Sequence, residues 1–309
     1  MEYRNLGQTG LKVSVLGYGA SSLGAVFRDI NEEDALQSVR VSLDMGVNFI
    51  DVSPFYGLTR AESMLGKALA GIPRDRYVMA TKVGRYGQTE FDFSAKRVIA
   101  SVDESLARMG LDYVDLIQCH DIEFGDLEQV IHETIPALRQ VCQAGKARFV
   151  GVTGFPLKAL RYVADRTAID SILSYCHYSL NNTLLQSAIP AFKSRGVGVI
   201  SASPLSMGLL SNRGAPTWHP APADVREACA RASAHCRAKG ADIARLAVQM
   251  AIMNPDIACT VVGSASSANM RENIKWCDEK PDAALLAEVL DILKPVHNKI
   301  WTSGKPEYN

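Results

Sequence analysis

The sequence lacks the features that mark membrane-spanning, secreted and nucleic-acid-binding chains. No apolar run approaches the ~18 residues that a membrane helix needs, and residues 1–5 (MEYRN) do not resemble a signal peptide. Lys plus Arg and Asp plus Glu each number 33, so there is no basic surplus to attract nucleic acid or an anionic membrane. We therefore expect a cytoplasmic protein with neither nucleic-acid nor membrane partners.

Cysteine is also sparse, with seven residues scattered among 309 and no CxxC pair. Such single cysteines are typical of reduced thiols in a cytosolic protein rather than of a disulfide framework. No spacing of histidines and carboxylates matches a metal-ligand set, so no metal is predicted. With 47% hydrophobic and 21% charged residues, the composition is that of a globular protein that buries a core unaided.

Short β-branched runs alternate with segments of helical period. Two clear helix patterns, 32–45 and 95–109, follow the capping candidates Asn31 and Ser94. The runs are typical of buried parallel strands and occupy residues 15–19, 47–51, 76–82, 113–118, 148–153, 171–176, 196–200 and 257–262.

Eight strands that alternate with helices predict a parallel sheet, either a (β/α)8 TIM barrel or a doubly wound sheet. No linker or break in composition divides the chain, which favours a single barrel domain over residues 1–309. Three additions to the barrel are expected: an N-terminal β-hairpin (3–6 with 12–15) that plugs its lower end, and extra helices over 224–239 and 282–297.

Four ionisable residues follow the predicted strands at the end where a barrel carries its active site. Asp51, Lys82 and His120 lie at strand ends, and Tyr56 lies in the loop after Asp51. A free tyrosine has a pKa near ~10, and a nearby ammonium is expected to lower that pKa. Taken singly, each residue has a structural alternative, such as an Asp51–Lys82 ion pair or a rim histidine. Their convergence favours acid–base catalysis.

The same residues carry a family resemblance. The segments DVSPFYG (51–57), AESMLG (61–66), Thr81-Lys82 and YVDLIQCH (113–120) together resemble the aldo-keto reductase family over essentially the whole chain. The resemblance implies a nicotinamide cofactor across the barrel top, with Tyr56 as acid/base beside Lys82, Asp51 and His120. It also implies NAD-dependent oxidation of a sugar, L-galactose, at C1 to its 1,4-lactone, as in ascorbate biosynthesis.

A Rossmann site is not expected, because GYGASS (17–22) lacks the third glycine and the following helix of the dinucleotide fingerprint. The resemblance instead implies a pyrophosphate loop after the seventh strand and an adenosine site after the eighth. The cofactor-binding candidates are Gly19, Thr153, Tyr175, Ser203, Pro204, Leu205, Ser206, Gly208, Gly263, Ser264, Asn269, Glu272 and Asn273.

NAD is predicted over NADP, because a 2′-phosphate needs cations or strong donors. Gly263 and Asn269 stand where many NADP-using members place Lys and Arg. The nicotinamide site departs from the family: Thr153-Gly154 replaces Ser-Asn, Tyr175 replaces Gln, and Ala202 replaces a stacking aromatic residue. Thr153 and Tyr175 are the candidates for the carboxamide, and an aromatic residue elsewhere can compensate for Ala202.

The candidates for contacts with a sugar are Phe55, Tyr86, Asp121, Trp218 and Trp301, each of which is otherwise a rim residue. An NADPH-dependent aldehyde or ketone reductase, a dehydrogenase of another aldose (L-fucose or D-arabinose) and a non-catalytic subunit with a reductase fold remain alternatives. The neutral net charge is compatible with either a monomer or a homodimer.

Overall fold

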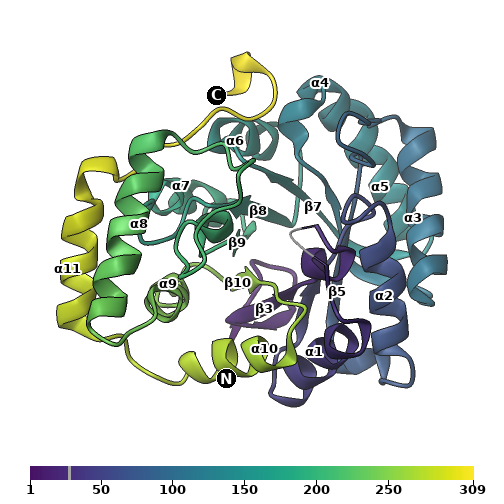
Figure 1. The fold of residues 1–309 in the computed structure, drawn as a ribbon. Coiled ribbons are helices and arrows are strands. Elements are labelled where there is room, and N and C mark those ends of the chain that lie inside the picture. The colour runs from purple at the N-terminus through teal and green to yellow at the C-terminus, as the bar shows by residue number, and fades with distance from the viewer. Residues whose placement is uncertain (27–28) are drawn as a thin grey trace.

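The computed structural model describes residues 1–26 and 29–309, and eight parallel strands form a closed barrel ringed by helices (Figure 1). Every predicted strand is present, and each pairs with its neighbours along the chain until the last closes onto the first. The (β/α)8 prediction is therefore confirmed. In chain order the strands are β3 (Leu16–Gly19), β4 (Phe49–Asp51), β5 (Val78–Val83), β6 (Val114–Cys119), β7 (Ala147–Gly154), β8 (Ser171–Tyr175), β9 (Gly198–Ala202) and β10 (Cys259–Val262).

The helices begin and end where the sequence signals place them. The Asn31 side chain accepts a hydrogen bond from the Asp34 N–H at the start of α1, and Gly110 ends α3 in the left-handed conformation. Within the described residues, no helix is long and apolar enough to cross a membrane. The ring contains α1 (Glu32–Asp44), α2 (Arg60–Leu69), α3 (Ala95–Met109), α4 (Leu127–Gln129), α5 (Ile135–Gln143), α6 (Leu157–Arg166), α7 (Leu184–Lys193), α9 (Ile243–Ile252) and α10 (Ser267–Trp276).

The three predicted additions to the barrel are also present. The extra helices are α8 (Ala223–Ala238) and α11 (Ala283–Leu293), which pack against each other outside the ring (Figure 1). The hairpin pairs β1 (Tyr3–Asn5) with β2 (Lys12–Ser14), and the adjoining Leu6 is fully buried among side chains at the start of the barrel strands. The hairpin therefore seals the lower end of the barrel.

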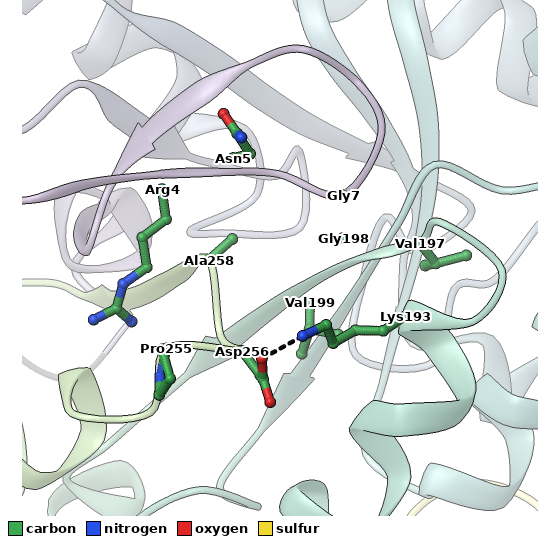
Figure 2. Close-up of a pocket in the computed structure, with 10 residues that line it drawn as sticks. All are labelled: Arg4, Asn5, Gly7, Lys193, Val197, Gly198, Val199, Pro255, Asp256 and Ala258. Atoms are coloured by element: carbon green, nitrogen blue, oxygen red, sulfur yellow. Dashed lines mark hydrogen bonds and ion pairs between the residues drawn. The ribbon is translucent and has the colours of Figure 1, made fainter.

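A hollow of about 270 Å³ remains beside this plug, between the hairpin and the segments that enter β9 and β10 (Figure 2). Its charged side chains already have partners. Lys193 forms an ion pair with Asp256, and the Arg4 guanidinium donates to the carbonyls of Ile252, Asn254 and Ile257. The hollow therefore offers no free cation to a ligand, and the reactive side chains gather at the opposite end.

Candidate active site

The structure brings the four predicted catalytic residues together at the upper end of the barrel. Asp51 ends β4, Lys82 lies in β5 and His120 follows β6, all three buried, while Tyr56 lies in the loop before α2. The Lys82 ammonium forms an ion pair with Asp51 and donates to the Val52 carbonyl at 2.9 Å. Its Nζ atom lies 4.8 Å from the centroid of the Tyr56 ring. Phenol, ammonium and carboxylate are thus adjacent.

Burial changes the protonation expected of this group. Removal of the Tyr56 hydroxyl from water raises its pKa to about 12, although the Lys82 charge opposes this shift. The expectation of a lowered tyrosine pKa is therefore wrong, because desolvation outweighs the ammonium. Burial also disfavours the charged form of Lys82, but Asp51 and Tyr56 more than offset it, so the lysine pKa is raised. The resting site holds a neutral phenol beside an ammonium.

His120 is a neutral imidazole with a defined orientation. Burial, followed by the charges of Lys82 and Arg85, holds its pKa well below the usual value. The Ser53 hydroxyl accepts from the Phe55 N–H at 3.1 Å and lies 2.9 Å from His120 Nδ1. We assign the serine proton to the hydrogen bond with Nδ1, and with this assignment the ring proton lies on Nε2. His120 packs edge-on to Tyr56, with 5.5 Å between ring centroids, and so presents a hydrogen-bond donor beside the phenol.

Two supporting residues were missed in the sequence. Gln118 Nε2 donates to Asp51 Oδ2 at 3.0 Å, so both carboxylate oxygens of Asp51 are engaged. Arg85 forms an ion pair with Asp121 and lies 3.8 Å from the centroid of the Phe55 ring. A glutamine within an apolar strand was the available signal for Gln118, since a buried amide needs a partner.

The predicted substrate residues separate into different places. Phe55 packs against His120, with centroids 5.9 Å apart, and Asp121 Oδ2 lies 3.7 Å from His120 Nε2. Both therefore border the catalytic group. Tyr86 instead accepts a hydrogen bond from the Gly84 N–H, and its ring lies under the Arg97 guanidinium of α3. Its hydroxyl and its ring are therefore both in contact with other parts of the protein.

Trp301 belongs to an aromatic cluster on another side of the mouth, and Trp218 lies at its edge. Trp301 stacks on Phe155 at 4.8 Å and meets His219 edge-on at 5.1 Å, and the exposed Trp218 stacks on His219. Tyr175 packs on Phe155 and lies directly beside Ala202 across β8 and β9. An aromatic residue thus stands next to the position where the family's stacking aromatic is absent.

The carboxamide candidates already have protein partners. Thr153 Oγ1 accepts from the Asp121 N–H at 3.1 Å and keeps its own proton to donate. Tyr175 interacts through its hydroxyl with Ser303, and burial followed by the charge of Asp121 raises its pKa well above the usual value. Both side chains are therefore neutral polar groups.

The predicted pyrophosphate loop has an unusual backbone. Ser203, Ser206 and Met207 have φ values of 58°, 46° and 51° and precede Gly208 at 103°. Pro204 and Leu205 lie within the same turn. His219 Nε2 donates to the Ser206 carbonyl at 3.0 Å, which anchors the turn from outside. Several of its N–H groups are already paired within the turn: those of Ser206, Gly208 and Leu209 donate to the carbonyls of Ser203, Leu205 and Ser206. The pyrophosphate role of the loop stays a prediction.

The predicted adenosine site lies where the ends of β3 and β10 meet. A Cβ on Gly263 would lie 2.2 Å from the Gly19 carbonyl oxygen, so no side chain fits there. Ser264 Oγ accepts from Asn269 Nδ2 at 3.3 Å, and the Asp34 carboxylate accepts from the Ser267 N–H at the start of α10. Asn273 is buried, whereas Glu272 is exposed and pairs with Lys275. Gly19, Gly263, Ser264 and Asn269 are thus all uncharged, and Arg271 is the cation among residues 261–273.

A closed barrel with a tyrosine, lysine, aspartate and histidine at its mouth is typical of an oxidoreductase of the aldo-keto type. The model of the aldo/keto reductase family matches residues 15–293, and the chain belongs to this family. Members of the family use a nicotinamide cofactor.

Three relatives place the chain within the family. It is 50% identical to an L-galactose dehydrogenase of Arabidopsis thaliana over 98% of both chains. It is 32% identical to a D-arabinose 1-dehydrogenase of Saccharomyces cerevisiae, covering 78% of this chain and 75% of the relative. The holo form of an aldo-keto reductase from Bacillus halodurans superposes with a TM-score of 0.81 at 27% identity, covering 98% of this chain and 99% of that one.

Proposed function

We propose that the protein oxidises L-galactose at C1 to L-galactono-1,4-lactone with NAD, in the cytoplasm, as a step of ascorbate biosynthesis. The observation that carries the proposal is the 50% identity to an L-galactose dehydrogenase over 98% of both chains. The assembled Tyr56, Lys82, Asp51 and His120 cluster supports catalysis rather than a non-catalytic role. The seven unpaired cysteines are consistent with a reducing compartment.

The choice of NAD rests on the charges at the adenosine site. The close approach of Gly19 leaves no room for a side chain at Gly263, and Asn269 is uncharged. Hydrogen bonds from Ser267 lower the pKa of Asp34, so the start of α10 already holds a carboxylate. A 2′-phosphate carries nearly two negative charges and needs cations or strong donors. Arg271 is the remaining cation among residues 261–273, and its position is not the family's usual phosphate clamp. A 2′-hydroxyl has no such requirement.

The residues of the mouth supply the proton chemistry. When bound, the nicotinamide supplies the hydride acceptor. Tyr56 accepts the proton of the C1 hydroxyl, while the Nε2 proton of His120 donates to the same oxygen as it gains negative charge. Because Tyr56 and Lys82 both hold protons at rest, the pair must lose one before Tyr56 can act as a base. Asp51 holds Lys82 in place, and Gln118 in turn holds Asp51.

Initial rates with a panel of aldoses and both cofactors test the proposal. We expect L-galactose with NAD to give the highest kcat/KM, and NADP to bind more weakly than NAD in titrations of protein fluorescence. Higher rates with D-arabinose or L-fucose would reassign the substrate. Tighter NADP binding together with aldehyde reduction would favour the NADPH-dependent reductase.

A further inference from the structure

Glu123 is a fully buried acid in the loop after β6 that plays no part in the chemistry above. Its Oε1 accepts from the Phe155 N–H and from the Ser303 hydroxyl, each at 3.0 Å. Its Oε2 is buried with no hydrogen-bond partner. A buried carboxyl oxygen without a partner is costly, so this placement calls for an explanation.

Two glycines form a socket around Glu123. A Cβ on Gly154 would lie 2.7 Å from Glu123 Oε2, and one on Gly304 would lie 2.3 Å from the Glu123 carbonyl oxygen. That carbonyl also accepts from the Lys305 N–H at 2.9 Å. The carboxyl therefore fills the space that a side chain at residue 154, at the end of β7, would take. The socket joins the loop after β6, the end of β7 and the last residues of the chain.

The loop after β6 and the last residues of the chain both border the mouth. The loop that carries Glu123 begins with His120 and Asp121, and Asp121 lies beside the ring of His120. Residues 301–309, here the C-terminal segment, run from the side of α11 towards α6 (yellow in Figure 1). Trp301 of this segment stacks on Phe155. A change at Glu123 therefore reaches the catalytic loop and the aromatic side of the mouth together.

The surroundings of Glu123 favour an uncharged carboxyl. Asp121, paired with Arg85, and the neutral Tyr175 are the titratable groups that act on it or respond to its charge. The nearby lysines are directed elsewhere: the Lys305 ammonium lies over the Tyr308 ring, and Lys158 donates to the Glu307 carbonyl. Burial, followed by the charge of Asp121, raises the pKa of Glu123 to about 8.

We propose that Glu123 is a positioning residue that ties the C-terminal segment to the loop carrying His120, and that ionisation of the carboxyl weakens this tie. Ionisation would place a second negative charge beside Asp121, whose own ion-pair partner is Arg85. The segment would then detach and take Trp301 away from the mouth. The sugar should bind more weakly as a result, and only this kinetic consequence rests on the proposed function.

Amide hydrogen exchange of the 301–309 peptide, measured by mass spectrometry from pH 6 to 9 and corrected for intrinsic rates, tests the tie without sugar or NAD. When the segment detaches, the pKa of Glu123 returns to its ordinary range. Between that pKa and the raised pKa of the attached state, ionisation of Glu123 favours detachment of the segment. Protection should fall by about tenfold per pH unit up to about pH 8 and then level off. Glu123→Gln should keep the segment protected and make the curve flat. Glu307→Gln, the matched change at an exposed site in the segment, should behave as wild type.

Gly304→Ala provides a second variant that loosens the socket without changing its charge, so it should lower protection at every pH. In kinetics, the KM for the sugar should rise with pH up to about pH 8 and then level off in the wild type, but stay constant in Glu123→Gln. A flat exchange curve in the wild type would contradict the proposed role of Glu123. A curve in Glu123→Gln that matches the wild-type curve would also contradict it. If the exchange curves are as expected but the protein does not oxidise aldoses, only the proposed function is overturned.

Discussion

The two ends of the barrel each hold a lysine–aspartate ion pair, but in opposite surroundings. At the lower end the Lys193 and Asp256 side chains are 54% and 45% exposed, whereas at the mouth Lys82 and Asp51 are 1% and 5% exposed. An exposed pair contributes little to stability, while a buried pair carries a large desolvation cost. The pair at the mouth is therefore better explained by its position beside Tyr56 than by stability.

The backbone shows the same contrast. Left-handed conformations in the lower loops occur at glycines, such as Gly46, Gly110, Gly145 and Gly196. In the upper loops they also occur at residues with side chains, among them Asp121, Cys176, Ser203, Ser206 and Met207. Such residues cost of the order of 1–3 kcal/mol each and gather where a site needs them. Backbone strain is thus present in the loops at the mouth, whereas glycines avoid it in the loops at the plugged end.

The largest expected effect comes from removing the buried ammonium. Lys82→Met leaves Asp51 buried without its cation, and we expect a loss of stability of about 3–5 kcal/mol. Turnover should fall on the order of 10²- to 10⁴-fold, because Tyr56 loses the charge that favours its phenolate. Urea unfolding and NADH formation at 340 nm measure the two effects.

Lys193→Met provides the matched control at the lower end, where we expect a change in stability of about 0–1 kcal/mol and normal turnover. Equal effects of the two substitutions would remove the distinction between the ends.

The plug gives the next largest effect, on stability alone. Leu6 is fully buried in the lower core, so Leu6→Ala should cost about 2–5 kcal/mol in urea unfolding. The kcat of the folded fraction should stay within about twofold of wild type because the mouth is untouched. A large fall in kcat without a loss of stability would show that the two ends are coupled.

A smaller effect is expected from pH. The pKa of Tyr56, raised to about 12, keeps the phenol protonated from pH 6 to 9, so its phenolate fraction rises by up to about tenfold per pH unit in that range. The kcat for sugar oxidation should rise with pH until another step limits it. A kcat that falls as the pH rises would contradict the role of Tyr56 as base.

The sequence predicted the elements better than their environments. The barrel strands and the hairpin could be predicted because β-branched runs and turn residues are local signals. Asp51, Lys82 and His120 followed from their places at strand ends. The pKa of Tyr56 was predicted in the wrong direction, because the identity of Lys82 is visible in a sequence but the loss of water around the phenol is not.

Glu123 was missed for a related reason. In the sequence it is an ordinary acid between Ile122 and Phe124. Its burial depends on two glycines, one of which lies some 180 residues away near the end of the chain. Gly154 was noted only as a departure from the family, and the carboxyl that fills its space comes from a different loop.

Tyr56→Phe removes one oxygen atom from the mouth and so isolates the contribution of the phenol hydroxyl to proton transfer. With L-galactose and saturating NAD, we expect NADH formation to fall by at least about 10³-fold, while the Kd for NAD and the urea midpoint stay close to wild type. Turnover within tenfold of wild type, with binding intact, would contradict proton transfer through Tyr56.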